Sequence, residues 1–205
     1  LIRWLEGYPW VNSWIGKLLR AQHCERHRQL RSIHEIVRYS QSPPISTARE
    51  QTQAPNTEAI VESLRVEEFV LGYPAEESSV LPTRFGNIIA AAEDYPFEVY
   101  KINAVALWPL LAPILTKSGY ARFIEYEKAA LEFALNSLVL SLVLGGELIF
   151  CSVLNPEYWL YIAAQGLGVF LIALILHELS LKGALGWGTT IRVSYDLHRE
   201  QLRKA

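Results

Sequence analysis

A single carboxylate inside a long apolar run is the side chain best placed to do chemistry. Glu147 lies within residues 133–156, which are otherwise apolar apart from a few small polar side chains. Counted back from the turn that follows, it lies about eight residues deep, or roughly 12 Å, which would be near the middle of a bilayer. An unpaired charge there costs about 2.5–3.5 kcal/mol or more. We therefore expect Glu147 to be protonated, paired or directed toward protein.

The neighbours of Glu147 suggest three roles for it. In an antiparallel hairpin, residues equally far from the turn lie at the same depth, so Glu147 should lie level with Ala164 and Gln165. The simplest role is a hydrogen bond between Glu147 and Gln165; the others are contact with a partner subunit and proton transfer, and one carboxylate does not make a proton relay. Small residues near this level would permit close helix contact, within a hairpin or with neighbouring helices. They are Gly145, Gly146, Ala164 and Gly168.

Histidines are the candidate metal and cofactor ligands. His23 and His27 are four residues apart, so on a helix they share a face and could bind zinc or copper. No fourth ligand is evident, and surface histidines in a basic segment explain the pair more simply. His177 could be an axial ligand of haem or chlorophyll, although it more simply extends to the membrane interface with Glu178. We therefore predict that no cofactor is bound.

Enzyme signatures are missing from the sequence. It has no GxxxxGK[ST] or GxGxxG phosphate-binding motif and no GxSxG, HExxH or CxxC motif. Catalysis by Thr83-Arg84, by Glu93-Asp94 or by Asp196 with His198 and Arg199 would require a pocket, and structural ion pairs are the simpler role. The sequence therefore predicts a protein that is not an enzyme.

Composition and charge exclude other classes. The chain has 205 residues, of which 51% are hydrophobic and 20% charged, so it is not a disordered chain. Its net charge of −2 gives no attraction to nucleic acid. Charge is segregated, at +4 over residues 1–42, −7 over 43–100 and +1 over 101–205.

Two apolar runs set the fold class. Residues 133–156 are followed by residues 158–176, which carry no charge, and Asn155-Pro156-Glu157 forms a tight turn between them. Each run is long enough to cover roughly the 30 Å of a hydrocarbon core, which needs about 20 helical residues. We predict an all-α membrane protein with a transmembrane hairpin at 131–179 and a cytoplasmic helical region. The alternative is a buried helical hairpin in a soluble protein.

Flanking positive charge predicts the topology. Basic residues flank the hairpin on both sides, and the turn has none. Positive charge favours the cytoplasmic side, so we expect both flanks there and the protein in a bacterial inner membrane. The basic residues are Lys117, Arg122 and Lys128 before the hairpin, and Lys182, Arg192, Arg199, Arg203 and Lys204 after it.

The front half reads as a helical arm followed by a linker. In the arm, residues 1–39, Asn12 or Ser13 can cap a helix from Trp14 to Tyr39. Its basic and aromatic residues suit either the headgroups of an anionic leaflet or packing on its own domain. Residues 40–57 are rich in Ser, Thr, Gln and Pro and predict a linker.

The remaining segments flank the hairpin. Residues 58–130 form the acidic cytoplasmic helical region, with one helix expected over 57–71 and another from Arg84 to Asp94. Thr83 would cap the second helix and Tyr95-Pro96 would end it. Within this region, 102–115 is too short to span and reads as interfacial, re-entrant or a buried connector. The tail, 180–205, reads as an amphipathic helix after a flexible joint at Gly183, Gly186 and Gly188.

Three stretches together resemble a family of uncharacterised bacterial integral-membrane proteins. They are LIRWLEGY (1–8), LPTRFGNIIAAAEDYPFEVYKINAVALWP (81–109) and YDLHREQL (195–202). The central stretch is distinctive and the tail is weak. The resemblance implies that LEGY ends a membrane helix and that further spans lie upstream, and it supplies no activity.

Taken together, these features predict a non-catalytic integral membrane subunit that assembles with or stabilises a larger bacterial membrane protein complex. Its partners would be the lipid bilayer and other membrane subunits. An alternative is a homo-oligomeric channel or transporter-like protein that uses Glu147. A third hypothesis is a membrane-anchored binder of a metal or cofactor through His23 and His27, or through His177.

Overall fold

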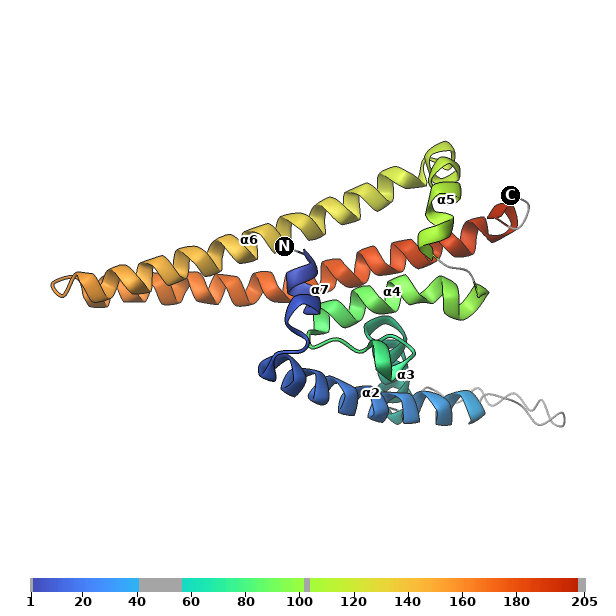
Figure 1. Ribbon diagram of the computed structural model, residues 1–205, viewed down its shortest axis with the longest axis horizontal. Helices are drawn as coiled ribbons and strands as arrows, with labels where there is room; N and C mark the ends of the chain where they lie inside the picture. Colours follow the sequence, from blue (N-terminus) through green and yellow to red (C-terminus); the bar gives the residue numbers. More distant parts are fainter. Residues whose placement is uncertain (1, 41–56, 102–103, 203–205) are drawn as a thin grey trace. The chain divides into compact units, whose positions relative to one another are not determined.

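The structure is a computed structural model that describes residues 2–40, 57–101 and 104–202, and all regular elements in these ranges are helical (Figure 1). The expected all-α fold is thereby confirmed. The chain divides into two compact units, Leu1–Trp108 and Pro109–Ala205. The predicted linker, 40–57, lies outside the described residues except for its two end positions.

Unit 1 is built from short and medium helices. They are α1 (Ile2–Glu6), the 3-10 turn η1 (Tyr8–Trp10), α2 (Trp14–Ser40), α3 (Thr57–Gly72), the 3-10 turn η2 (Glu77–Ser79) and α4 (Arg84–Tyr100). Helix α3 lies where the acidic helix over 57–71 was expected, and α2 matches the expected arm helix to within one residue.

The α2–α3 contact forms one core of unit 1. Leu30 of α2 is buried with Phe69 and Tyr73, which lie at the end of α3 and just after it. The ring of His27 is also fully buried, 5.2 Å from the Phe69 ring. Aromatic and aliphatic side chains thus bury one face of α2, as the helical period requires.

Helices α2 and α4 begin with the same capping arrangement. Ser13 Oγ accepts from the Gly16 amide (3.0 Å) and donates to the Trp10 carbonyl (2.7 Å). Thr83 Oγ1 accepts from the Gly86 amide (2.9 Å) and donates to the Glu6 carbonyl (2.9 Å). Each hydroxyl satisfies a free amide of the first helical turn, which confirms both residues as N-caps. The second cap differs because its carbonyl lies 77 residues away in sequence.

The expected end of α4 at Tyr95-Pro96 is wrong, because the helix continues to Tyr100 with Pro96 buried inside it. An interior proline removes a backbone hydrogen bond and its ring crowds the carbonyl four residues earlier, and burial of Pro96 helps to offset this cost. The helix ends at Lys101, whose φ of 59° is left-handed and whose amide donates to the Phe97 carbonyl.

Helix α5 (Ala104–Ser118) covers most of the apolar segment 102–115 and contains both of its prolines. It includes the division point between the units. Residues 102–103 lie outside the described part of the chain. The position of α5 relative to a bilayer remains a prediction.

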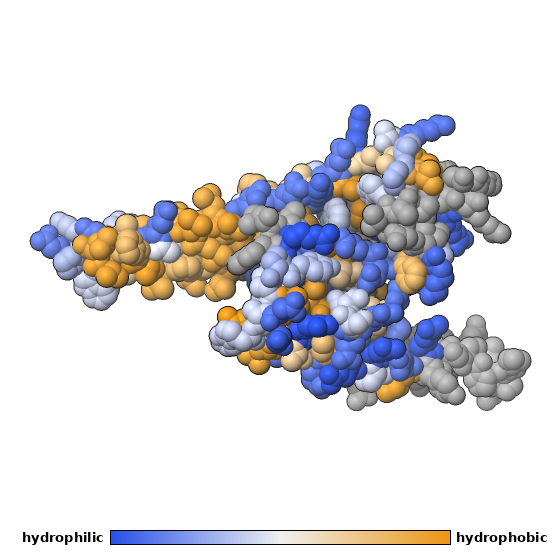
Figure 2. All heavy atoms as spheres, in the orientation of Figure 1, coloured by the Kyte–Doolittle hydropathy of each residue, from blue (hydrophilic) through white to orange (hydrophobic). Residues whose placement is uncertain are grey.

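Unit 2 is dominated by two long antiparallel helices, α6 (Tyr120–Leu154) and α7 (Trp159–Leu202), joined by a short turn (Figure 1). Both are long and apolar enough to cross a membrane, and only 17% and 11% of their most apolar windows are buried. A hairpin buried in a soluble core would hide most of these residues, so their exposure favours the membrane hairpin over that alternative. Apolar side chains cover the outside of the hairpin near its turn (Figure 2).

The expected flexible joint before the tail is wrong, because α7 continues without a break through Gly183, Gly186 and Gly188. Two of these glycines allow close packing instead. A Cβ on Gly183 would lie 3.4 Å from Leu131 of α6, and one on Gly186 would lie 3.0 Å from the Glu127 carboxylate. Helical glycines here reduce the distance between helices while the backbone hydrogen bonds continue.

Candidate functional site

Two glycines, Gly145 of α6 and Gly166 of α7, lie where the two helices of the hairpin pack together, and we call this contact the glycine seam. A Cβ on Gly166 of α7 would lie 3.0 Å from Ile149 and 3.3 Å from the carbonyl oxygen of Gly145. A Cβ on Gly145 would lie 3.3 Å from the Phe170 ring. Small residues let the two backbones approach, and the large side chains beside them fill the space. Of the predicted helix-packing residues, Gly145 lies in this seam.

Gly166 is a seam residue that the sequence reasoning missed. A usable signal was present on α6, where buried residues recur at intervals of seven. They are Leu131, Leu138, Gly145 and Ser152. Such a stripe identifies the face that contacts a partner helix. Gly166 is about as far after the turn as Gly145 is before it, so an antiparallel hairpin places the two glycines at the same level.

Glu147 lies on the opposite side of α6 from this seam. It follows Gly145 by two residues, which is about 200° around a helix. Its side chain is exposed, and among the described residues no hydrogen bond or ion pair to it is found. The expected hydrogen bond between Glu147 and Gln165 is not formed, because Gln165 is exposed on α7 about 100° from Gly166.

The other small residues face outward as well. Ala164 and Gly168 are exposed on α7, and a Cβ on Gly168 or on Gly146 would meet no atom within 4 Å. Ala164 and Gly168 are four residues apart and share one face of α7. At this level of the hairpin, Gly145 and Gly166 therefore face the other helix, whereas Gly146, Ala164 and Gly168 face the surroundings.

The candidate metal ligands are engaged in unit 1. His23 Nδ1 is 3.0 Å from the Tyr73 hydroxyl, and His27 Nε2 is 3.0 Å from the Pro74 carbonyl oxygen. A carbonyl only accepts, so His27 carries its proton on Nε2. The Nδ1 atom of His27 is buried without a hydrogen-bond partner within the described residues. Burial lowers the pKa of His23, and the Arg84 charge lowers it further.

Those contacts hold α2 to the segment after α3, which is a structural role. The described residues contain no group of three or more metal-ligating side chains. The third candidate ligand, His177, is exposed well inside α7.

Parts of two stretches on which the expected resemblance rests, residues 5–8 and 81–87, meet in unit 1. Gly86 packs directly against the carbonyl of Glu6, to which Thr83 also donates. Asn87 is fully buried; its amide donates to the Leu81 carbonyl (3.0 Å) and its Oδ1 accepts from the Leu81 amide (2.7 Å). We call this contact the LEGY–LPTRFGN clasp. The side chains of Thr83 and Asn87 both hydrogen-bond backbone groups, so these two residues fit a structural role.

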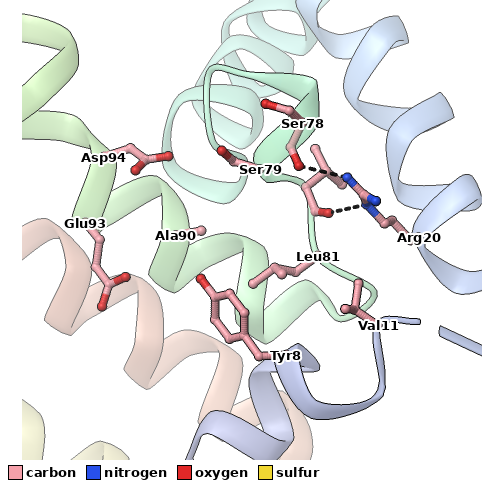
Figure 3. A pocket seen from close by; sticks show the side chains of 10 residues that line it. Tyr8, Val11, Arg20, Ser78, Ser79, Leu81, Ala90, Glu93 and Asp94 are labelled. Atoms are coloured by element: carbon pink, nitrogen blue, oxygen red, sulfur yellow. Dashed lines mark hydrogen bonds between the residues drawn. The ribbon is translucent and has the colours of Figure 1, made fainter. Parts of the chain in front are cut away.

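A pocket of about 320 Å³ with both polar and apolar lining residues adjoins the clasp (Figure 3). The Tyr8 ring and the carboxylates of Glu93 and Asp94 lie on one side of it, and the loop before α4 lies on the other. Burial raises the pKa of Asp94, and the nearby Glu98, Glu93 and Glu76 raise it further. The remaining lining residues are Val11, Arg20, Ser78, Ser79, Val80, Leu81 and Ala90.

Negative charge around the pocket also affects its neighbours. Burial raises the pKa of the Tyr8 phenol, and the Glu93 carboxylate adds to the effect. Burial raises the pKa of Glu6 as well; Arg3, 3.5 Å away, opposes this and Glu93 reinforces it. Among the described lining residues we find no hydrogen-bonded pair of nucleophile and base, so the arrangement does not indicate a reaction.

Arginines of α2 make contacts within unit 1. Arg20 donates to the carbonyls of Val80 and Ser78, both at 2.8 Å, as Figure 3 shows. Arg26 pairs with Glu68 at 2.9 Å and Arg28 with Glu77 at 3.1 Å. These contacts favour the interpretation that the arm packs on its own acidic domain.

The chain matches no family model, and no curated protein or solved structure is similar enough to count as a match. Its function must therefore be argued from the geometry of the molecule itself.

Proposed function

We propose that this chain is a non-catalytic integral membrane subunit that assembles with, or stabilises, a larger bacterial membrane protein complex. One observation carries the proposal. The two helices of the hairpin pack through Gly145 and Gly166, while Glu147 faces outward from the most apolar part of α6. The residue that most needs a partner in a membrane therefore has none within the hairpin.

The energetics of the bilayer support this interpretation. A charged group near the bilayer centre costs about 2.5–3.5 kcal/mol on insertion scales, and such residues usually face protein or water. A hydrogen bond from a neighbouring helix would satisfy the Glu147 carboxyl group. On α7, the exposed Ala164 and Gly168 would allow another helix to approach closely. The hairpin thus offers outward faces of the kind by which membrane helices associate.

The proposal includes an orientation in the bacterial inner membrane, with both flanks of the hairpin in the cytoplasm. Basic residues on the flanks and their absence from the 155–157 turn support it. The test uses Asn155→Cys in a background with Cys24→Ser and Cys151→Ser, treated with a membrane-impermeant maleimide. We expect labelling from the periplasmic side in intact spheroplasts. Labelling only after lysis would contradict the orientation.

The main experiment is extraction from native membranes in a mild detergent, followed by native gel separation and mass spectrometry of the band. We expect a band larger than the monomer, which Glu147→Leu converts to the monomer while the chain stays folded by circular dichroism. Glu157→Gln, in the turn, is the matched control and should leave the band unchanged. A solitary monomer for the unmodified chain would contradict the proposal.

A further inference from the structure

The outer face of α6 carries a second stripe of regularly spaced residues. Successive members are four, three, four, three and four residues apart, which is the heptad spacing of helices that pack along their length. All six side chains are exposed, including Leu140 at 68% and Phe150 at 65%. We call them the outer stripe: Asn136, Leu140, Val143, Glu147, Phe150 and Leu154.

The inner face of α6 shows what this spacing means in this molecule. There the buried residues Leu131, Leu138, Gly145 and Ser152 recur every seven positions along the contact with α7. The outer stripe repeats the same interval about 180° away around the helix. It extends over 18 residue steps, or roughly 27 Å, which is nearly the thickness of a hydrocarbon core. Helix α6 therefore presents a second face with the spacing of a helix contact, opposite the face that α7 covers.

Two polar residues in the outer stripe bear on which helix could pack against it. Asn136 and Glu147 lie eleven residues apart, or about three helical turns. A carboxamide contains both a donor and an acceptor, and so does a protonated carboxyl group. Each residue can therefore satisfy an identical residue that faces it. Polar residues at such positions associate membrane helices and fix their register.

We propose that the outer stripe binds α6 of a second copy of this chain, in a parallel pair related by a twofold axis along the membrane normal. Copies inserted with the same topology run parallel, and in a parallel pair equivalent heptad positions meet at the same depth. Asn136 then faces Asn136, and Glu147 faces Glu147. This inference rests on the proposed function, because it names the partner helix for the same face.

Disulfide formation in native membranes tests the arrangement. Single cysteines replace Leu140 or Val143 in the background with Cys24→Ser and Cys151→Ser, and the control is Leu142→Cys, which lies about 100° from the stripe. After oxidation we expect a covalent dimer of this chain at both stripe positions. It should form about ten times faster than at the control position, because a disulfide requires its Cβ atoms to lie close together.

Substitution of the two polar residues of the outer stripe, Asn136 and Glu147, gives a second measurement. Energy transfer between labelled copies in liposomes, measured over a range of dilution, reports the dimer dissociation constant. We expect Asn136→Leu with Glu147→Leu to raise that constant about tenfold or more. Glu147→Gln keeps a donor and an acceptor, so it should stay near the unmodified value, as should Glu157→Gln.

The outcomes separate this inference from the proposed function. Dimers of this chain that form preferentially at the stripe positions support it. Cross-links from those positions only to a different protein overturn the second copy as occupant and leave the proposed function standing. Equal cross-linking at Leu142→Cys overturns the outer stripe as a contact face, and an absence of any partner at the stripe positions overturns both proposals.

Discussion

Unit 1 turns apolar side chains inward where its helices meet, whereas the hairpin of unit 2 turns most of its apolar side chains outward. In unit 1, Leu30, Phe69 and Tyr73 are buried where α2 meets α3, although Trp14 and Ile36 of α2 are exposed. On α6 and α7, side chains such as Phe133 (73% exposed) and Val153 (76% exposed) cover the surface. The exposed apolar surface of α6 and α7 is compatible with a membrane location.

The units also differ in how their close contacts are made. In unit 1, Gly86 packs against a backbone carbonyl, that of Glu6. In unit 2, a Cβ on Gly166 would meet the tip of the Ile149 side chain first, at 3.0 Å, and the Gly145 carbonyl oxygen only at 3.3 Å. A backbone group inside a polar clasp cannot move aside, whereas the end of an isoleucine can change rotamer. Unit 1 should therefore tolerate added volume less well than unit 2.

The largest expected effect is that of Gly86→Ala. The added methyl group would overlap the Glu6 carbonyl and crowd Thr83 Oγ1, so the clasp must open. We expect a loss of about 3 kcal/mol or more in the free energy of opening of α4, measured by hydrogen exchange in detergent. Gly72→Ala is the control, because a Cβ there meets no atom within 4 Å. Equal effects of the two substitutions would contradict the claim that the clasp stabilises α4.

Gly166→Leu should have the next largest effect. The new side chain would crowd Ile149 and the Gly145 carbonyl oxygen, which we expect to reduce hairpin stability by about 1–3 kcal/mol. Titration of helix separation with sodium dodecyl sulfate in a mild detergent measures this stability. Gly168→Leu adds the same volume on the outward face and should leave the hairpin unchanged. If Gly168→Leu proved the more damaging, the assignment of inner and outer faces would be reversed.

Arg20→Gln tests whether unit 1 depends on specific polar contacts. The guanidinium group holds two carbonyls of the loop before α4, and its loss should reduce stability by about 1–2 kcal/mol. Arg26→Gln breaks only the pair with Glu68, which is partly exposed, and should change stability by about 0.5 kcal/mol or less. Thermal unfolding in low and high salt distinguishes the two. Similar losses for both would indicate that charge, rather than the loop contact, matters.

Asp94→Asn should have the smallest effect and the opposite sign. The raised pKa of Asp94 means that its protonated form favours folding; this contribution is complete below the ordinary value of 3.8 and is lost as the pH rises through the raised pKa. Asp94→Asn should therefore stabilise unit 1 at pH 7, by less than about 1 kcal/mol because water screens the group. Unfolding curves at pH 4 and pH 7 measure it, with Glu67→Gln on α3 as the control. Destabilisation at pH 7 would show that the carboxylate has a favourable partner.

Local features followed from the sequence because each depends on neighbours along the chain. The Ser13 and Thr83 caps, the acidic helix α3 and the two long apolar helices were predicted from residue type and spacing alone. The end of α4 and the glycine joint were predicted wrongly for one reason. Proline and glycine interrupt a helix in isolation, but packing around Pro96 and at Gly183 and Gly186 favours a continuous helix.

Tertiary structure decided which residues face one another. The sequence by itself determined that Glu147 lies deep in an apolar helix, but both Gly145 and Gly146 were available to the seam, and a rotation of one residue moves a side chain by about 100°. Only the packing of α6 on α7 selects Gly145 and Gly166 and leaves Glu147 outside. The clasp likewise joins Glu6 to Thr83 across 77 residues, because closing so long a loop depends on contacts that no local pattern encodes.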